Sequence, residues 1–338
     1  NGAEGILIKS AAGQANGTFI FNGTAPQATV EFYSKASINA SGEKKWQYFG
    51  VPVTSITALP TFEGAYVRKW NEAGEYNSKT NPIWTALTNS SELLPVHGYE
   101  ISQKVPVTYQ LPGTLFNGNI SFPLSYTSAA DYRGNHIVSN PYTAAINIKN
   151  LTTIGTNIES TVFLYNTGSF SEWGGGNGGS GTVKESAGGY TSIPVNQSGY
   201  AGLATSIPSM QGFMVKANAA STLNIPYSSV IKNEQPQRAK QEQDSKVYSC
   251  ISLVGKDTID RAWIFTEAHC SEGFDDGWDG TKLADKNATQ IFIAEKHGNM
   301  QVSSKDKLHG SYISIVAPAG EVLSLKFTQH DLQQIYSR

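Results

Sequence analysis

The chain has 338 residues, which is enough for two or three domains that each bury a core. Aromatic residues make up 11% and charged residues only 15%, a balance typical of many buried rings beneath a neutral, polar surface. A formal net charge of −2 provides no basic surface for nucleic acid, and no run of about 18 apolar residues is present to span a membrane.

Short alternating segments fill the first 112 residues. GILIKS, GTFIFNG and ATVEFYSK are separated by Gly, Asn and Pro, a spacing typical of antiparallel strands. Four further strand-like segments follow within residues 46–113: WQYFGVPV, GAYVRKW, LPVHGYEI and PVTYQLPG. No helix is indicated by a period of 3.6 residues. The sequence therefore predicts an all-β fold.

The same order of segments recurs after Gly113. GTLFNGNISFPLSYT, NHIVSNPY, STVFLY, IPSMQGFMVKA and STLNIPYSS follow one another as the earlier segments do. Five landmarks in matching order predict a pseudo-duplicated antiparallel β-sandwich or jelly-roll-like region over residues 1–232, with halves of about 1–112 and 113–232.

The two segments at the centre of this repeat are Leu94–Ile101, LPVHGYEI, and Ile207–Val215, IPSMQGFMV. Each contains a Pro turn, then a Gly, then an aromatic residue that begins an apolar strand. We expect Gly212 to lie in a turn where a β-branched residue is disfavoured.

Two polar segments interrupt the strand pattern. Residues 174–189 are Gly-rich and predict a surface loop, because the helix and the GK[ST] ending of a phosphate cradle are absent. Residues 233–246, NEQPQRAKQEQDSK, predict an interdomain linker. Alternating segments then resume, which predicts a C-terminal β-sandwich over residues 247–338.

The two cysteines of the chain, Cys250 and Cys270, both fall in this last region. If they lie on the two arms of one hairpin, they are out of register with each other, and a simple hairpin does not bridge them. The sequence leaves open whether they form a disulfide or remain thiols.

The motifs NHIVSNPY, IPSMQGFMVKA and GFDDGWDG, in this order, resemble the secreted and surface proteins of gut and oral Bacteroidetes. The resemblance covers most of the chain, although Asp276 stands where Asn is expected. It implies an extracellular or outer-membrane-associated protein, often the C-terminal part of a larger polypeptide, with no known catalytic activity. The chain begins without the features of a signal peptide, so we expect any leader to have been removed or to lie in a precursor. Whether a closing strand follows residue 338 is left open.

The densest carboxylate cluster is the segment FDDGWDG, with Asp275 and Asp279 as candidate calcium ligands. A calcium loop would also need a side-chain oxygen at position 277, which is Gly277 here, and a Glu at position 286, which is Lys286 here. A β-turn whose Asp side chains accept hydrogen bonds from their own backbone is therefore the favoured interpretation. Trp278 is the candidate for stacking on a sugar ring, and a packing role at the end of the sandwich is favoured for it too.

No nucleophile or zinc motif is present, so we predict no catalytic residues. A glycoside hydrolase would need two facing carboxylates, and the available candidates are Glu63, Glu72, Glu100 and Glu159. The favoured function is a non-catalytic adhesion or scaffold module with a polysaccharide or a cell-surface protein as its partner. The alternative is a carbohydrate-binding module, and a glycoside hydrolase is the third hypothesis. We expect no cofactor, and calcium is the alternative.

Overall fold

The computed structural model describes residues 5–40, 42, 44–152, 154–167, 189–234, 246–255, 259–283, 288–308 and 310–330. Strands form nearly all of the regular structure, which confirms the all-β prediction. Within the described residues the helical elements are single turns: α1 (Ala58–Thr61), η1 (Ile148–Asn150), η4 (Val195–Gln197) and η5 (Tyr227–Ser229).

The chain forms two compact units. Unit 1 comprises Asn1–Glu159 and Ser206–Gln237, and unit 2 comprises Ser160–Thr205 and Arg238–Arg338. This division differs from the expected boundary between residues 232 and 247, because residues 160–205 belong to unit 2. Most of the expected linker, and all but one residue of the expected Gly-rich loop, lie outside the described residues.

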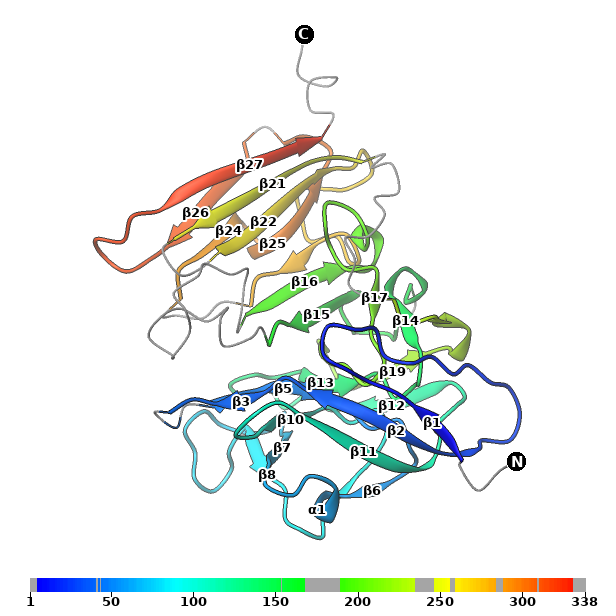
Figure 1. Cartoon of the computed structure of the whole chain (residues 1–338). Helices are drawn as coiled ribbons and strands as arrows, with labels where there is room; N and C mark the ends of the chain where they lie inside the picture. The colour runs from blue at the N-terminus through cyan, green and yellow to red at the C-terminus, as the bar shows by residue number, and fades with distance from the viewer. Residues whose placement is uncertain are drawn as a thin grey trace. The chain divides into compact units, whose positions relative to one another are not determined.

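The described residues of unit 1 form strands in several small sheets (Figure 1): β1 (Ile6–Ile8), β2 (Gln27–Ser34), β3 (Ser37–Ile38), β4 (Lys44–Lys45), β5 (Gln47–Phe49), β6 (Ile56–Thr57), β7 (Tyr66–Trp70), β8 (Trp84–Ala86), β9 (Glu92–Leu93), β10 (Tyr99–Ser102), β11 (Val107–Thr114), β12 (Ile120–Leu124), β13 (Asn135–Ser139), β14 (Ala145–Asn147), β17 (Ser206–Ile207), β18 (Gly212–Lys216), β19 (Ser221–Ile225) and β20 (Val230–Ile231). Two larger sheets have the orders β1-β2-β11 and β5-β10-β7-β8, and β14 pairs with both β17 and β20.

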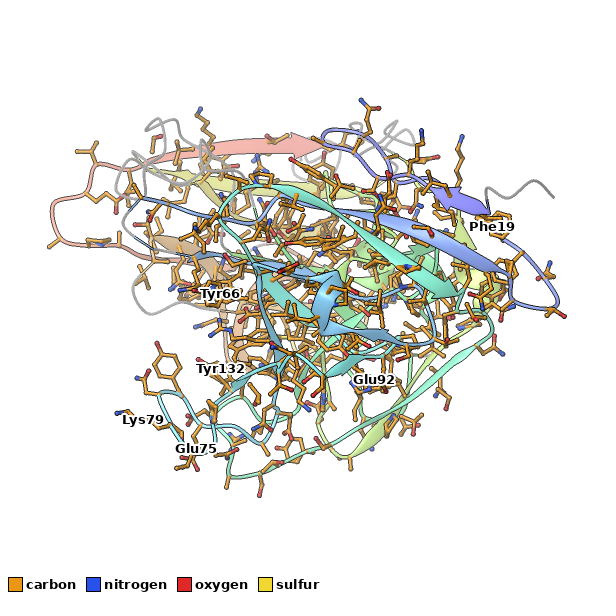
Figure 2. The ribbon with its side chains drawn as sticks, turned by 60° about the horizontal axis from the view of Figure 1, so that its bottom comes forward. Phe19, Tyr66, Glu75, Lys79, Glu92 and Tyr132 are labelled. Atoms are coloured by element: carbon orange, nitrogen blue, oxygen red, sulfur yellow. The ribbon has the colours of Figure 1, made fainter. Side chains whose placement is uncertain are left out.

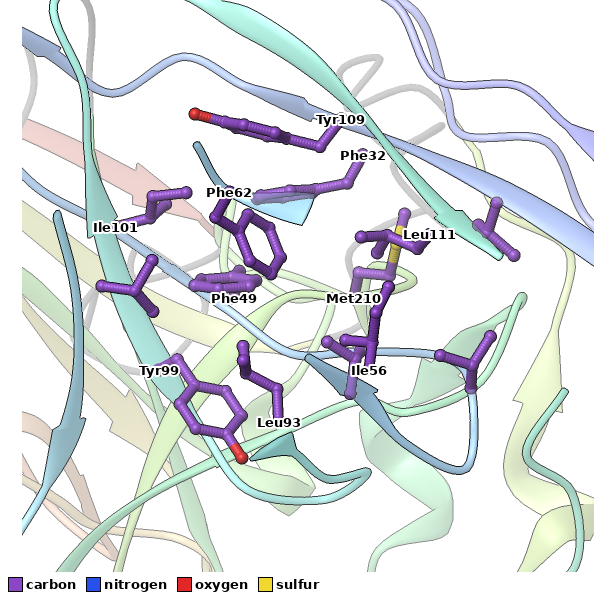
Figure 3. Close-up of a cluster of buried hydrophobic side chains, with 14 of the residues drawn as sticks. Phe32, Phe49, Ile56, Phe62, Leu93, Tyr99, Ile101, Tyr109, Leu111 and Met210 are labelled. Atoms are coloured by element: carbon purple, nitrogen blue, oxygen red, sulfur yellow. The ribbon is translucent and has the colours of Figure 1, made fainter. Parts of the chain in front are cut away.

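The core of unit 1 contains aliphatic side chains together with the aromatic rings of Phe32, Phe49, Phe62, Tyr99 and Tyr109 (Figure 3). Strand β2 alternates buried and less buried positions, so Val30 and Phe32 point inward, as its period of two predicts. Phe32 stacks on Phe49 with ring centroids 5.0 Å apart, and Phe62 meets Phe49 edge-on at 5.3 Å. The alternation of apolar and polar residues in β2 therefore determines which face of this strand is buried.

Strand pairings recur along the chain in the same order. In unit 1, β2 pairs with β11 and β5 with β10, and further along β12 pairs with β19 and β13 with β18. Likewise β7 pairs with β8, and β15 (Thr161–Tyr165) pairs with β16 (Tyr190–Pro194). These pairs contain the segments whose order is repeated in the sequence, while the boundary between residues 112 and 113 remains a prediction.

The two central segments of the repeat share an unusual backbone. Val96 and Met210 each lie two residues before the Gly and have positive φ, at 70° and 60°. The Val96 carbonyl accepts a hydrogen bond from Ser139 N–H at 2.8 Å, and the Met210 carbonyl accepts one from Gly50 N–H at 2.9 Å. The segment Leu94–Ile101 is thus hydrogen-bonded to the end of β13, and the segment Ile207–Val215 is hydrogen-bonded to the residue after β5.

Gly212 is the first residue of β18, and its φ is not in the left-handed region. A Cβ added there would lie 2.8 Å from the Phe49 backbone N and 2.8 Å from the Tyr48 Cβ. The expectation of a turn was therefore wrong: a close approach to β5 is what requires a glycine.

Unit 2 is built around a seven-stranded sheet of order β26-β24-β25-β22-β21-β27, with β23 also paired to β25 (Figure 1). The strands are β21 (Val247–Val254), β22 (Ile259–Thr266), β23 (Gly280–Thr281), β24 (Gln290–Glu295), β25 (Gly298–Lys305), β26 (Tyr312–Val316) and β27 (Ser324–His330). One apolar cluster contains Ile251, Ile264 and Ile293.

Strand β16 explains why residues 160–205 belong to this unit. The Ser192 backbone N–H donates to Gln301 Oε1 at 2.8 Å, and Ser192 Oγ donates to the Thr281 carbonyl at 2.6 Å. A Cβ at Gly280 would lie 2.9 Å from the Ser192 Cβ, so β16 and β23 approach closely. These are contacts of high sequence separation, which local patterns do not encode.

Candidate functional site

The segment FDDGWDG forms a hydrogen-bonded turn before β23. The Asp275 carbonyl accepts from the N–H groups of Trp278 and Asp279, and the Asp275 N–H donates to Asp279 Oδ2 at 2.8 Å. The Asp275 carboxylate accepts from the N–H and the hydroxyl of Ser271, at 2.6 and 3.0 Å. Asp275 and Asp279 thus each accept a hydrogen bond from a backbone N–H group four residues away, which is the kind of local bond that the favoured interpretation expects.

Asp279 is 1% exposed, and Ser304 N–H donates to its Oδ1 at 2.7 Å. Burial raises the pKa of Asp279 to about 6, while the N–H donors of Asp275 and Ser304 act in the opposite direction. The buried Asp279 carboxylate therefore links the turn to β25 through the hydrogen bond from Ser304.

The outer part of the turn contacts the residues around β15 and η4. Asp276 accepts from the backbone N–H and the hydroxyl of Ser160, both at 2.7 Å. The Gly277 carbonyl accepts from Asn196 N–H at 2.9 Å, and Gly277 has a φ of +77°. The turn thus joins two distant stretches of unit 2 through polar contacts.

Trp278 is half-buried, and protein groups contact its ring. His269 meets the indole edge-on with centroids 4.3 Å apart, and Lys246 Nζ lies 4.7 Å from the indole centroid. The same ammonium lies 4.6 Å from the Tyr200 ring and 2.6 Å from Glu267 Oε1. These contacts favour a packing role for Trp278, and sugar binding at this residue remains an untested hypothesis.

The sequence analysis missed Lys246, which it placed at the end of a linker. Here two aromatic rings and a carboxylate surround the ammonium, an arrangement that stabilises a cation by cation–π and ionic contacts. The only sequence signal was the aromatic residues themselves, whose positions are more than 20 residues away from Lys246.

Metal binding at Asp275 and Asp279 remains a prediction. Within the described part of the chain, no group of three or more His, Cys, Asp or Glu side chains is arranged to hold a metal ion. Both carboxylates accept hydrogen bonds from the protein, and a calcium ion would compete with those donors.

The structure forms no disulfide between Cys250 and Cys270, and both are buried. Cys250 lies opposite Trp263 in the pairing of β21 with β22, whereas Cys270 follows the end of β22. Burial, together with Asp275 and Asp279, raises the pKa of Cys270 to about 12, so its thiol is a weak nucleophile at neutral pH.

The four candidate carboxylates of a glycoside hydrolase all lie in unit 1. Glu63 is exposed, whereas Glu100 forms an ion pair with Arg68 and Glu159 forms one with Lys216. Burial raises the pKa of Glu100 to about 8, against the influence of Arg68. Glu100 and Glu159 thus each have a cationic partner within the protein.

Glu72, the fourth candidate, is 5% exposed and organises a loop. Its carboxylate accepts from Ser125 Oγ, Thr127 Oγ1 and the N–H groups of Thr127 and Gly134, at 2.7 to 2.8 Å. Burial alone would raise the pKa of Glu72, but these four hydrogen bonds lower it overall. The arrangement is that of a structural carboxylate.

The largest concentration of exposed apolar side chains lies on the two edge strands of unit 2. On β26 these are Tyr312 (75% exposed), Ile313, Ile315 and Val316, and on β27 they are Leu325 and Phe327 (55%). β26 pairs only with β24, and β27 only with β21, within the described residues. Both strands therefore present unpaired backbone groups next to apolar side chains.

The fold and these surfaces define an all-β protein with an open-edged sheet in unit 2, and no described helix is long and apolar enough to cross a membrane. No family model and no solved structure matches the chain.

Among known proteins, the chain is similar to the minor fimbrium subunit Mfa5 of Porphyromonas gingivalis, a member of the Bacteroidetes, with 32% identity over 355 residues. The alignment covers 96% of this chain and 28% of that protein. The chain is therefore an extracellular, cell-surface protein, and the similarity supports an adhesion or scaffold role.

Proposed function

We propose that the chain is a non-catalytic part of a cell-surface fimbrium, in which the edge strands β26 and β27 pack against a β-strand of a neighbouring subunit. The printed name of the similar protein, a fimbrium subunit, supports assembly into a fibre. The structure supports it through one observation, the pair of exposed apolar edges on a single sheet.

An open sheet edge adds a strand from another chain unless something prevents it. Natural proteins protect edges with charged residues, proline or bulges. Strand β26, YISIV, contains neither charge nor proline, and β27, SLKFTQH, has one lysine and one histidine. Main-chain hydrogen bonds would provide affinity, and the flanking apolar side chains would provide contact area.

The neighbouring strand is expected to be apolar and uncharged, because it would meet Ile315 or Phe327. Burial of these side chains contributes about 25 cal/mol for each Å² of apolar surface removed from water. The chain spans 28% of the similar protein's length, so the rest of that polypeptide is a further source of partner surfaces in a fibre.

The test introduces charge on the edges. Phe327→Lys and Ile315→Lys would be expressed together in the native polypeptide in its own bacterium, and surface fibres would be sheared from the cells and probed with an antibody against the chain. We expect the unsubstituted protein in the fibre fraction and the double variant depleted from it, because a lysine at an edge opposes strand addition.

Tyr76→Lys is the matched control, since Tyr76 is 63% exposed and belongs to unit 1, whereas both edge strands belong to unit 2. It should enter fibres as the unsubstituted protein does. Absence of the unsubstituted chain from fibres would overturn the proposed function. Normal incorporation of the double variant would overturn the assignment of the interface to β26 and β27.

A further inference from the structure

Unit 1 contains an open pocket of about 730 Å³ that lies within this unit alone. Its walls contain Ile38 of β3 and Lys44 of β4, then Ala65 and the first residue of β7, Tyr66, and finally Lys104 after β10. The volume lies within the range of about 300–1,000 Å³ that holds small-molecule ligands.

Strand pairing fixes the walls of this pocket. Ile38 pairs with Lys44 across the hairpin, and Tyr66 pairs with Ser102, two residues before Lys104. The Ser102 hydroxyl donates to the Ser37 carbonyl at 3.2 Å, which joins the wall that contains Lys104 to the hairpin.

A buried glutamine strengthens the same junction. Gln103 is 3% exposed, and its amide donates to the carbonyl of Ala36 at 2.7 Å and to the Ser34 hydroxyl at 3.0 Å. A site with walls held by strands and buried hydrogen bonds needs little ordering when a ligand binds.

The chemistry of the lining favours an anion with an apolar face. Lys44 Nζ lies 4.7 Å from the centroid of the Tyr66 ring, which is 55% exposed, and Lys104 is exposed at the rim. No acidic side chain occurs among the described lining residues, and none of the described carboxylates pairs with either lysine. Lys44 and Lys104 thus line the same pocket as the exposed Tyr66 ring.

We propose that this pocket binds an acidic saccharide, a sugar ring bearing a carboxylate or a sulfate. The lysines would pair with the acidic group, while Tyr66 and Ile38 would contact the ring's C–H face. An acidic peptide fits less well, because extended peptides bind at a sheet edge or in a long groove, whereas this open pocket is lined by only three short segments. The inference rests on the proposed function, because it gives a ligand class to a chain that belongs to a cell-surface fimbrium.

The experiment is isothermal titration calorimetry of the purified chain with four probes. Hyaluronan tetrasaccharide carries carboxylates, a chondroitin sulfate tetrasaccharide adds sulfates, chitotetraose is neutral, and a short poly-glutamate is an acidic peptide. We expect saturable binding of one or both acidic saccharides that weakens as salt rises. We expect chitotetraose and poly-glutamate to bind at least about tenfold more weakly.

Two variants and two matched controls localise the site. Tyr66→Ala and Lys104→Glu should each weaken binding by about tenfold or more. Tyr76→Ala and Lys79→Glu make the same chemical changes at exposed positions outside the pocket, and they should leave binding unchanged; Figure 2 shows Tyr66 and Lys79 at separate places on unit 1. Circular dichroism would verify that all four variants fold.

Equal binding of chitotetraose, tighter binding of poly-glutamate, full binding by the pocket variants, or no binding of either acidic saccharide would each overturn the proposal. The double variant of the fibre experiment changes only residues of unit 2, whereas the pocket variants change only residues of unit 1, so either proposal can fail while the other stands.

Discussion

At the scale of single residues, Gly212 is where the backbone leaves least room. The Phe49 nitrogen and the Tyr48 Cβ each lie 2.8 Å from where a Cβ would stand, and neither is the end of a flexible side chain. We expect Gly212→Val to destabilise the protein by about 1–3 kcal/mol, as overpacking does. The melting temperature of unit 1 should fall by roughly 2–10 °C, measured by calorimetry.

The control for this substitution is Gly5→Ala, because no atom lies within 4 Å of an added Cβ at Gly5. Its melting temperature should match that of the unsubstituted chain. An unchanged melting temperature for Gly212→Val would show that β18 and β5 do not approach as closely as described.

Glu72 provides a prediction about pH. Its folded pKa lies below the ordinary value of 4.5, so the folded chain binds fewer protons than the unfolded chain near that pH. The stabilisation is present above about pH 4.5 and is lost as pH falls through the folded pKa. We expect Glu72→Gln to lower the melting temperature most at neutral pH, with the difference shrinking in acid.

Glu63→Gln is the matched control, since Glu63 is exposed and should show no such pH-dependent difference. A difference between Glu72→Gln and the unsubstituted chain that stayed constant from neutral to acidic pH would contradict the structural role of the ionised carboxylate.

At the scale of elements, the turn FDDGWDG acts as an internal connector. Replacing Asp279 with Ala would leave the N–H groups of Ser304 and Asp275 without their acceptor, at a cost of about 1–3 kcal/mol for each buried donor. We expect a lower melting temperature for unit 2 in Asp279→Ala, and a smaller change for Asp276→Ala because Asp276 is exposed.

The same melting experiment tests the calcium hypothesis. Because protein donors already occupy Asp275 and Asp279, we expect equal melting temperatures in calcium and in chelator. A clear rise in calcium that disappears in Asp279→Ala would instead assign a metal site to this turn.

Sequence patterns predicted the strands well, because the alternation that marks a strand lies within a few consecutive residues. The alternation in QATVEFYS fixed the buried face of β2, and the recurring segments correspond to recurring strand pairs. The reason given for Gly212 was wrong, since a close approach between β18 and β5 depends on residues more than 150 positions apart.

The candidate site was predicted only in part, for the same reason. The turn of Asp275 and Asp279 could be inferred from its Gly and Asp residues. The grouping of Lys246 with Tyr200 and Trp278, and of β16 with β23, arises from long-range packing, which residue types alone do not specify.

At the scale of the whole molecule, the exposed edges of β26 and β27 are the feature that most needs a partner. An isolated chain with such edges is prone to associate through them. In a fibre, strand addition would convert exposed amides into hydrogen-bonded ones, and amide exchange reports this change directly.

The most direct test is therefore hydrogen–deuterium exchange of the chain in isolated fibres compared with the purified chain. The account predicts that peptides covering Tyr312–Val316 or Ser324–His330 gain protection in fibres, while peptides from β2 and β11, which are already paired, do not change. Equal exchange of both edge strands in the two samples would contradict assembly through this sheet.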